Sequence, residues 1–220
     1  MPDNIRWSFS GLKDFINCPR QYNEVKNLRR FVKAQTEQML YGTVVHKALE
    51  DYVRDGSPLA KNYERYKTLL DELLEIPGIR HPERKMALTE KHEPCEFDAP
   101  DYWVRGIVDL LIIDGDTAYI VDYKTGSAKY PDTKQLKLMA LMTFAHHPEV
   151  MRVKAGLLFV AHNMFIDEDY SRSDIDFMWS VFTPHLTRLQ LATQNDAWVP
   201  NPTGLCGWCP VTSCEFHKER

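Results

Sequence analysis

Asp109, Asp122 and Lys124 are the residues of this sequence whose types and spacing point most directly to chemistry. Asp122 and Lys124 are two positions apart, so in a β-strand their side chains lie on the same face. Carboxylates are hard oxygen ligands of the kind that Mg²⁺ or Mn²⁺ prefers, and a lysine beside them adds positive charge. The set would suit a divalent metal site, provided that the fold brings the two aspartates together.

The surrounding sequence predicts a hairpin that does so. Two runs rich in Val, Ile, Leu and Tyr flank a short segment of Asp and Gly. If Gly115 and Asp116 form a two-residue loop, Asp109 lies directly opposite Asp122. Opposed carboxylates on a buried sheet repel each other, so one should be protonated unless a cation lies between them. The alternative is a surface hairpin with solvated charges, in which Lys124 only neutralises Asp122.

Cysteines near the two ends of the chain form a second constellation. Three of them have the spacing C-x2-C-x4-C: Cys206, Cys209 and Cys214. In a reducing compartment such a cluster favours a metal site over disulfides. Cys18 would complete a four-cysteine set for an iron–sulfur cluster or Zn²⁺, whereas His217 would close a zinc site, and the spacing leaves both open. Cys95 is interpreted as a small strand residue, and unligated tail cysteines are the alternative to a metal.

The composition is that of a globular protein, with 220 residues, 44% of them hydrophobic, which is enough for a sizeable core. The net charge of −4 gives no global attraction for nucleic acid. Locally, the segment 17–34 is basic, with Glu24 as its one acidic residue; its basic residues are Arg20, Lys26, Arg29, Arg30 and Lys33. No apolar run approaches ~20 residues and no signal-peptide pattern is visible, which predicts a cytoplasmic protein.

The elements that must position these residues are helices and strands in mixed order. Helices are predicted at residues 8–18, 38–54, 59–75, 131–146 and 174–194, and strands at 86–97, 102–113, 117–124 and 152–165. Residues 79–85 and 167–173 are expected to be polar loops. His46 lies at the margin of the apolar face of the second helix. The order predicts an α/β fold with a central mixed sheet flanked by helices.

Taken together, the chain resembles RecB-type nucleases of the PD-(D/E)xK superfamily over almost its whole length. It is most similar to the iron–sulfur group, which includes the CRISPR-associated exonucleases of the Cas-four family, the AddB nuclease domain and phage exonucleases. The matching segments, in chain order, are residues 8–22 around Cys18, Gly42 to His46, Arg105 to Asp109, Asp122 to Lys124, Gln135, and the C-terminal cysteines. The chain departs from the pattern at Val108, where Pro is often found, and at Met139, where an aromatic residue is usual.

The resemblance implies a PD-(D/E)xK, restriction-endonuclease-like core and a metal-dependent DNA exonuclease that hydrolyses phosphodiester bonds at single-stranded ends. It implies one or two Mg²⁺ or Mn²⁺ ions held by His46, Asp109, Asp122 and the carbonyl of Tyr123. Lys124 would orient the attacking water, and Gln135 would position water, Lys124 or the strand. A [4Fe–4S] cluster would join the N-terminal and C-terminal segments through Cys18, Cys206, Cys209 and Cys214. A non-catalytic nucleic-acid-binding module, stabilised by a cluster or zinc, is the alternative.

Further expectations concern the DNA, the partners and the domain organisation. Phosphate contacts are expected from Arg20, Lys26, Arg29, Arg30, Lys129, Lys134 and Lys137, and base stacking from Tyr22 or Tyr130. Glu90 is a candidate for a residue that supports the metal ligands without binding the metal itself. The simpler interpretation is a solvated charge on a strand. A helicase or a recombination or CRISPR protein would be a separate partner. The chain is expected to form one domain, with a cluster-binding segment at 1–37, a nuclease core at 38–198 and a cysteine-rich tail at 199–220.

Overall fold

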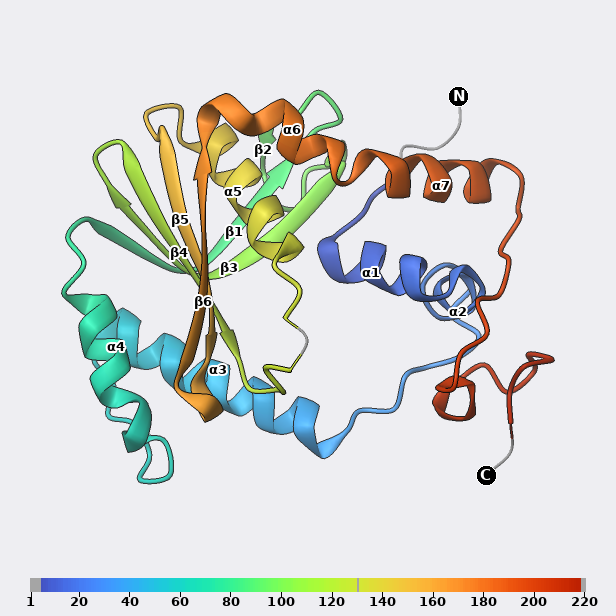
Figure 1. Ribbon diagram of the computed structural model, residues 1–220, viewed down its shortest axis with the longest axis horizontal. Helices are drawn as coiled ribbons and strands as arrows, with labels where there is room; N and C mark the ends of the chain where they lie inside the picture. Colours follow the sequence, from blue (N-terminus) through green and yellow to red (C-terminus); the bar gives the residue numbers. More distant parts are fainter. Residues whose placement is uncertain (1–4, 130, 219–220) are drawn as a thin grey trace. The chain divides into compact units, whose positions relative to one another are not determined.

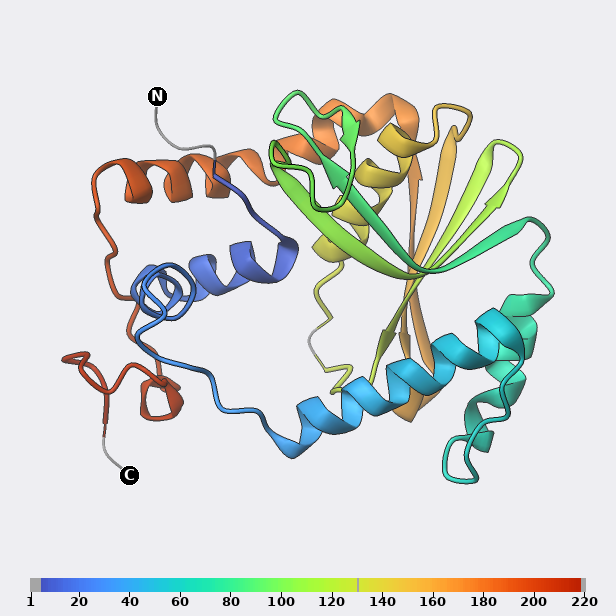
Figure 2. The same ribbon diagram turned by 180° about the vertical axis from the view of Figure 1, so that it is seen from behind.

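The computed structural model describes residues 5–129 and 131–218, and Figures 1 and 2 show it from opposite sides. The described residues form one six-stranded sheet in the order β2-β1-β3-β4-β5-β6. β4 and β5 are parallel and the other neighbours are antiparallel, so the sheet is mixed, as predicted. The strands are β1 Ile79–Leu88, β2 Pro94–Cys95, β3 Val104–Asp114, β4 Thr117–Lys124, β5 Arg152–Phe159 and β6 Met164–Ser171.

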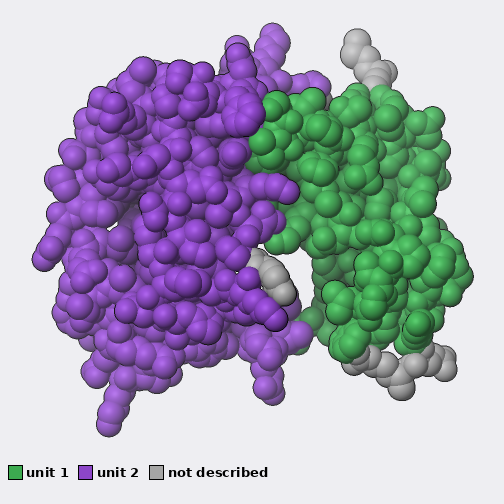
Figure 3. Space-filling view, in the orientation of Figure 1, with its two compact units in different colours: residues 1–35, 179–220 green, residues 36–178 purple. Residues whose placement is uncertain are grey.

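Contacts along the chain divide it into two compact units, which Figure 3 colours separately. One unit contains the residues up to Gln35 and those from Trp179 onward, and the other extends from Thr36 to Met178. The sheet belongs to the second unit. The sequence analysis assigned residues 38–198 to one core, whereas the structure groups 179–198 with the segments that carry the terminal cysteines.

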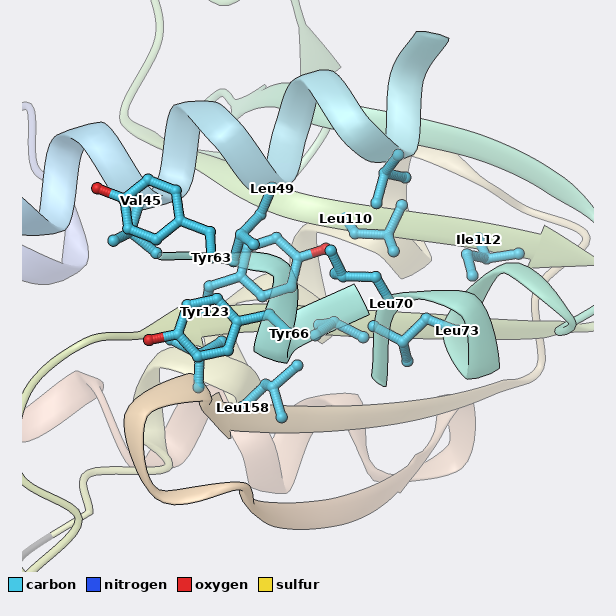
Figure 4. Close-up of a cluster of buried hydrophobic side chains, with 13 residues drawn as sticks. Val45, Leu49, Tyr63, Tyr66, Leu70, Leu73, Leu110, Ile112, Tyr123 and Leu158 are labelled. Carbon is cyan, nitrogen blue, oxygen red and sulfur yellow. The ribbon is translucent and has the colours of Figure 1, made fainter. Parts of the chain in front are cut away.

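Helices cover both faces of the sheet (Figures 1 and 2). On one face, α3 and α4 pack their apolar residues against β3, β4 and β5, and Figure 4 shows this cluster around Leu49, Leu110 and Tyr123. On the other face lies α5, whose residues are buried almost all round. None of the described helices has the length and apolar character needed to cross a bilayer. The helices of this unit are α3 Glu37–Asp55, α4 Lys67–Leu74, α5 Lys134–His146 and the start of α6 Ile175–Ser180, with 3₁₀ turns η2 Glu64–Tyr66, η3 Val160–His162 and η4 Arg172–Asp174.

The long helix α3 begins and ends where its sequence signals predict. Thr36 caps its first turn by accepting a hydrogen bond from the Met39 N–H over 3.3 Å, and Gly56 ends it with a φ of 74°. Its buried residues recur every four positions: Val45, Leu49 and Val53. The apolar face is narrower than predicted, because Leu40 and Val44 are exposed.

Two segments that the sequence analysis assigned to polar loops are strands. Residues 79–85 belong to β1, and most of residues 167–173 belongs to β6. Their charged side chains are unfavourable for a strand on propensity alone, but their backbone groups pair with the apolar strands β3 and β5. Pairing with an existing strand therefore overrides the local composition.

Three other predicted elements are shorter than expected. The predicted strand 86–97 ends at Leu88 and is followed by a turn, and a helix within 59–75 begins only at Lys67. The predicted helix 174–194 consists of two helices, α6 and α7 (Thr183–Gln194), because the helical conformation is interrupted between Ser180 and Thr183. Pro184 lies in the first turn of α7.

The unit that contains both chain ends is helical. Its elements are α1 Phe9–Asn17, α2 Pro19–Tyr22, the π-helical turn η1 Asn23–Asn27, α7 Thr183–Gln194 and the 3₁₀ turn η5 Cys206–Trp208. Ser8 caps α1 by accepting a hydrogen bond from the Gly11 N–H. Phe15 packs edge-on against Tyr22 and Trp198, with ring centroids 5.8 Å and 6.4 Å apart. This aromatic cluster joins the N-terminal helices to the chain after α7.

Candidate active site

The β3–β4 hairpin has the register that the sequence predicts. Asp114 pairs with Thr117, so Gly115 and Asp116 form the two-residue turn. Gly115 has a φ of 58°, in the left-handed region that such turns require and that glycine adopts without a steric penalty. The turn thereby fixes which residues of the two strands face each other.

The two strands separate where the predicted carboxylates lie. The last β3–β4 pair is Leu110 with Val121, one position before Asp109 and Asp122. Beyond that pair β3 continues beside β1, while β4 continues beside β5 as far as Lys124. The two aspartates therefore stand at the mouth of a fork in the sheet rather than as a regular cross-strand pair.

Asp109 links the fork to helix α3. Its Oδ2 accepts a hydrogen bond from the Tyr123 backbone N–H over 2.7 Å and lies 3.3 Å from His46 Nδ1. Burial opposes protonation of His46, but the bond to Asp109 and the charges of Asp109 and Asp122 outweigh it and raise the pKa of the imidazole. The face of α3 that carries Val45 and Leu49 thus also brings His46 to the carboxylates.

Asp122, Lys124 and Gln135 form a closed hydrogen-bonded group on the other side of the fork. Gln135 Nε2 donates to Asp122 Oδ1 over 2.8 Å, and Lys124 Nζ donates to Gln135 Oε1 over 2.9 Å. Lys124 also forms an ion pair with Asp122 Oδ2. Burial, with Asp122 only 3% exposed, and then the charge of Asp109 raise the pKa of Asp122 to about 6. The amide of Gln135, on α5, fixes both a carboxylate and an ammonium group.

Two glycines allow the helices to approach the fork closely. A Cβ atom at Gly42 would lie 3.0 Å from Thr125 Oγ1, directly after the D-x-K segment, so α3 can reach the site one turn before His46. A Cβ atom at Gly106 would lie 2.8 Å from Met142 Cε of α5. A side chain at Gly42 would require Thr125 to shift by a few tenths of an ångström, whereas one at Gly106 would displace only the flexible end of Met142.

The donor set fits a hard divalent cation. Two carboxylates, an imidazole and the backbone carbonyl of Tyr123 stand around the fork, and the buried Asp122 Oδ2 has the Lys124 ammonium group as its ion-pair partner. As they stand, no three His, Cys, Asp or Glu side chains in the described ranges converge closely enough to hold an ion. Lys124, Gln135 and the Tyr123 N–H engage the carboxylate oxygens instead.

The four cysteines of the predicted cluster line a single pocket in the unit that contains both chain ends. Cys18, Cys206, Cys209 and Cys214 surround a cavity of about 30 Å³, together with Pro200, Asn201, Pro202, Val211, Phe216 and His217. His217, the alternative fourth ligand, lines the same cavity. Its position therefore does not distinguish a site of four cysteines from a zinc site of three cysteines and one histidine. Cys95 lies on β2 and does not line this pocket.

N–H groups are directed at the sulfur atoms of this pocket. Gln21 Nε2 donates to Cys209 Sγ over 3.3 Å, and the Gln21 backbone N–H donates to Cys18 Sγ over 3.5 Å. The Thr203 backbone N–H donates to Cys206 Sγ over 3.3 Å. Such bonds stabilise thiolate sulfur, and outer partners of this kind orient metal ligands. The four cysteines thus share one cavity lined with N–H donors, but among the described residues they do not converge closely enough to hold an ion as they stand.

Most of the expected DNA-contacting residues of the terminal unit are paired with carboxylates. Nitrogen-to-oxygen distances are 3.5 Å from Arg20 to Glu215, 3.9 Å from Lys26 to Asp14 and 3.7 Å from Arg30 to Glu24. Arg29 is exposed, with a φ of 53°. Tyr22 is 9% exposed and packs in the aromatic core, so its expected stacking role is not available at the surface.

The expected contacts near the fork have mixed outcomes. Lys134 begins α5, one position before Gln135, and Lys129 lies exposed in the loop before it. Lys137 lies over the Tyr170 ring at 5.7 Å, which gives it a packing role. Tyr130 lies outside the described residues.

The glutamate that approaches this site is not the one expected. Glu90 is exposed in the turn after β1, so it is a solvated charge. Glu83 on β1 occupies the register position opposite Asp109, but the sequence analysis assigned it to a loop. The sequence could reveal Glu83 only if residues 79–88 were recognised as a strand, because its position opposite Asp109 follows from the β1–β3 pairing.

Comparisons with known proteins identify the family of this chain. A model of the PD-(D/E)XK nuclease superfamily matches residues 6–214, and the chain therefore belongs to this superfamily. A search of curated proteins found no match. A crystal structure from Eubacterium rectale, of a protein provisionally named an exonuclease, is 12% identical with a TM-score of 0.51, covering 97% of this chain and 87% of that one. The crystal structure of SSO0001 is also 12% identical, with a TM-score of 0.48 and coverage of 99% and 89%.

Proposed function

We propose that this protein is a metal-dependent deoxyribonuclease that degrades single-stranded DNA from its ends. Superfamily membership supports a phosphodiester-hydrolysing nuclease that uses a divalent metal. The observation that carries the proposal is the group formed by Asp122, Lys124 and Gln135. A protein that only bound nucleic acid would have no need for a buried aspartate held against a lysine beside a second carboxylate.

In this proposal His46, Asp109, Asp122 and the carbonyl of Tyr123 hold Mg²⁺ or Mn²⁺. The cation lowers the pKa of bound water and stabilises negative charge on the phosphate. Asp109, which is fixed by the Tyr123 N–H, sets the distance between β3 and β4, and His46 joins it from α3. When the cation binds, the carboxylate oxygens would exchange contacts with Lys124, Gln135 and the Tyr123 N–H for contacts with the metal.

Lys124 is the proposed catalytic residue that orients the attacking water and places positive charge near the developing oxyanion. Its side chain is 32% exposed, so it can reach a substrate, while Asp122 and Gln135 restrict its rotation. Gln135 acts through Lys124 and Asp122 and is a positioning residue.

The proposed substrate is DNA with a free end, and Lys129 and Lys134 beside the fork would contact its phosphates. Arg20, Lys26, Arg29 and Arg30 would add contacts from the terminal unit by exchanging their carboxylate partners for phosphates. We expect the protein to act in the cytoplasm, with any helicase or recombination or CRISPR function supplied by a separate partner.

For the cysteine pocket we propose a [4Fe–4S] cluster held by Cys18, Cys206, Cys209 and Cys214. Four thiols and three N–H···S hydrogen bonds around one cavity support a thiolate-bound centre. The ligands come from residues 18 and 206–214, so the centre would tie the two ends of the chain together. Zinc held by three of these cysteines and His217 is the second candidate, and iron and acid-labile sulfide measured on anaerobically purified protein distinguish the two.

The nuclease proposal is tested with end-labelled linear and circular single-stranded DNA of the same sequence, each incubated with Mg²⁺, Mn²⁺ or EDTA. We expect linear DNA to be shortened from its ends in either metal, no reaction in EDTA, and little cleavage of circles. An Asp122→Asn variant should lose the activity. Binding of DNA without cleavage in any metal would instead support the non-catalytic binding module.

A further inference from the structure

Trp208 is the most exposed tryptophan among the described residues. It is 64% exposed, whereas the other four tryptophans of the chain are buried or partly buried. Tyr22, which the sequence analysis expected to stack on bases from this part of the chain, lies instead in the aromatic core. A large aromatic ring that is left in water is a surface on which the flat face of a partner can be buried.

The 3₁₀ turn η5 fixes Trp208 and places Leu205 beside it. The Trp208 backbone N–H donates to the Leu205 carbonyl over 3.0 Å, and residues three positions apart in such a turn lie on the same side. Leu205 is 71% exposed, so the two side chains form an exposed apolar surface. Directly after Trp208, Cys209 accepts a hydrogen bond from Gln21 of α2. The tail that carries the ring is thus bound to the basic segment 17–34.

The two units of the chain carry opposite net charges. With His and Cys counted as neutral, the terminal unit, which contains both chain ends, has 10 Lys and Arg against 6 Asp and Glu, and the unit that contains the sheet has 17 against 25. The overall charge of −4 therefore divides into +4 and −8. A polyanion is attracted to the first unit and repelled by the second, unless metal ions neutralise carboxylates there. The terminal unit is the one whose charge favours nucleic acid.

Arg29 contributes a charge to this unit that no carboxylate neutralises. The other basic side chains of the segment 17–34 are each paired with Asp or Glu. Arg29 is exposed, and no ion pair of its guanidinium group is seen within the described ranges. It follows the π-helical turn η1, and its φ of 53° ends that turn. Such an arginine can bind a phosphate without first releasing a carboxylate partner.

We propose that Trp208 stacks on a base of single-stranded DNA and that Arg29 binds a phosphate group of the same strand. The inference rests on the proposed nuclease function and names the contact that selects single strands as the substrate. Aromatic rings stack on any base, because every base has a π face, so the contact is independent of sequence. In a duplex the bases are stacked on one another, so Trp208 distinguishes single strands from duplex, whereas Arg29 contacts the phosphates of both.

Photocrosslinking tests the stacking contact in the wild-type protein. A single-stranded oligonucleotide in which every thymidine is replaced by 5-iododeoxyuridine is bound without added divalent cations, so that cleavage does not begin. The complex is irradiated, and mass spectrometry of its peptides locates the crosslinks. We expect Trp208 to be crosslinked to the DNA. Crosslinks that are confined to other residues when the DNA is saturated with protein would overturn the proposal.

Variants of Trp208 separate stacking from the simple burial of apolar area. Trp208→Phe keeps an aromatic face and Trp208→Leu removes it, while Leu191→Ala, which shortens an exposed apolar side chain on α7 of the same unit, is the control. In fluorescence anisotropy, Trp208→Leu should bind single strands about 5- to 100-fold more weakly and bind the duplex as wild type does. Trp208→Phe and Leu191→Ala should stay within about threefold of wild type. Equal losses for single strands and duplex, or no loss, would contradict the stacking role.

The salt dependence of binding tests Arg29 separately. Arg29→Ala should reduce the slope of log Kd against log salt by about 0.7, the value for one phosphate contact on a single strand, whereas Trp208→Leu should leave this slope unchanged. An unchanged slope in Arg29→Ala would overturn the phosphate contact.

Two further outcomes place the result relative to the rest of the account. A wild-type dimer that dissociates in Trp208→Leu, with unchanged DNA affinity, would assign the surface to a second copy of the chain and overturn the proposal. Wild type that binds single strands through Trp208 but cleaves none in Mg²⁺ or Mn²⁺ would contradict the proposed function and support this inference. Metal-dependent cleavage with no effect of Trp208 on binding would contradict this inference alone.

Discussion

The carboxylate of Asp109 accepts a hydrogen bond from the backbone N–H of Tyr123, at the position where β3 and β4 separate. The bond replaces the ladder contact that the separating strands no longer make and holds the fork at a fixed width. The Tyr123 carbonyl, from the same residue, is the proposed backbone ligand of the metal. One side chain therefore has a structural role toward β4 and a proposed chemical role toward His46.

Replacing Asp109 should accordingly affect stability as well as activity. In Asp109→Ala the Tyr123 N–H and His46 both lose their partner, and we expect the free energy of unfolding to fall by about 1–3 kcal/mol. Urea denaturation in EDTA measures this loss without any contribution from a metal. Asp98→Ala, which removes an exposed carboxylate paired with Arg105, is the control and should change stability by less than about 1 kcal/mol. Equal stability of Asp109→Ala and wild type would mean that the fork does not depend on this bond.

The stability of the metal-free protein should depend on pH through Asp122. Burial and then Asp109 raise its pKa from 3.8 to about 6, so the folded state holds this proton more tightly than the unfolded chain. The stabilisation is complete below about pH 4 and is lost as the pH rises through 6, amounting to roughly 3 kcal/mol. Asp122→Asn should lack this contribution, and saturating Mg²⁺ should remove it from wild type. If the free energy of unfolding of metal-free wild type and metal-free Asp122→Asn changed identically between pH 4 and 7, this role of Asp122 would be contradicted.

Gln135→Leu tests whether the amide positions Lys124. It removes the partner of both Lys124 and Asp122, so the single-turnover cleavage rate should fall about 10- to 100-fold while DNA affinity changes little. Gln38→Leu, at an exposed position early in α3, should behave as wild type. A Gln135→Leu defect that appears only as weaker DNA binding would place Gln135 in substrate contact instead.

Gln21→Leu tests the hydrogen bond to Cys209. If the pocket holds an iron–sulfur cluster, loss of this bond should shift its reduction potential and shorten its lifetime in air. Lys33→Ala is the control, because it removes a hydrogen bond to Asp14 Oδ1, 2.6 Å away, in the same unit but outside the lining of the cysteine pocket. The control should keep the potential. The same potential in Gln21→Leu and wild type would reduce the Gln21 contact to a packing interaction.

The hairpin and its register could be predicted because they depend on local information. A two-residue turn at Gly115 fixes every β3–β4 pair, and the alternation of side chains then puts Asp122 and Lys124 on one face. The helix α3 was equally accessible, since Thr36 and Gly56 mark its ends. The register could not predict that β3 and β4 separate just before the aspartates, because that depends on how β1 and β5, which come from distant segments, pair with the outer edges of the two strands.

Glu83 shows where sequence reasoning failed. The segment 79–85 contains Arg, His, Pro, Glu and Lys, which is the composition of a loop, and only its pairing with the apolar strand β3 makes it a strand. The hydrogen bonds of Gln135 to both Asp122 and Lys124 could not be predicted either. They depend on how α5 packs over the sheet, where Met142 lies against Gly106. Both features come from packing between distant segments.

The most direct test of the account is the single-turnover rate of cleavage of linear single-stranded DNA in Mg²⁺ by wild type, Lys124→Ala and Lys154→Ala. Lys154 lies on the neighbouring strand β5, opposite Tyr119 and away from the fork, so it controls for the loss of a lysine from this sheet. The account predicts that Lys154→Ala cleaves as wild type does, and that Lys124→Ala binds the DNA but cleaves it at least about 100-fold more slowly. Equal cleavage by Lys124→Ala and wild type would contradict it.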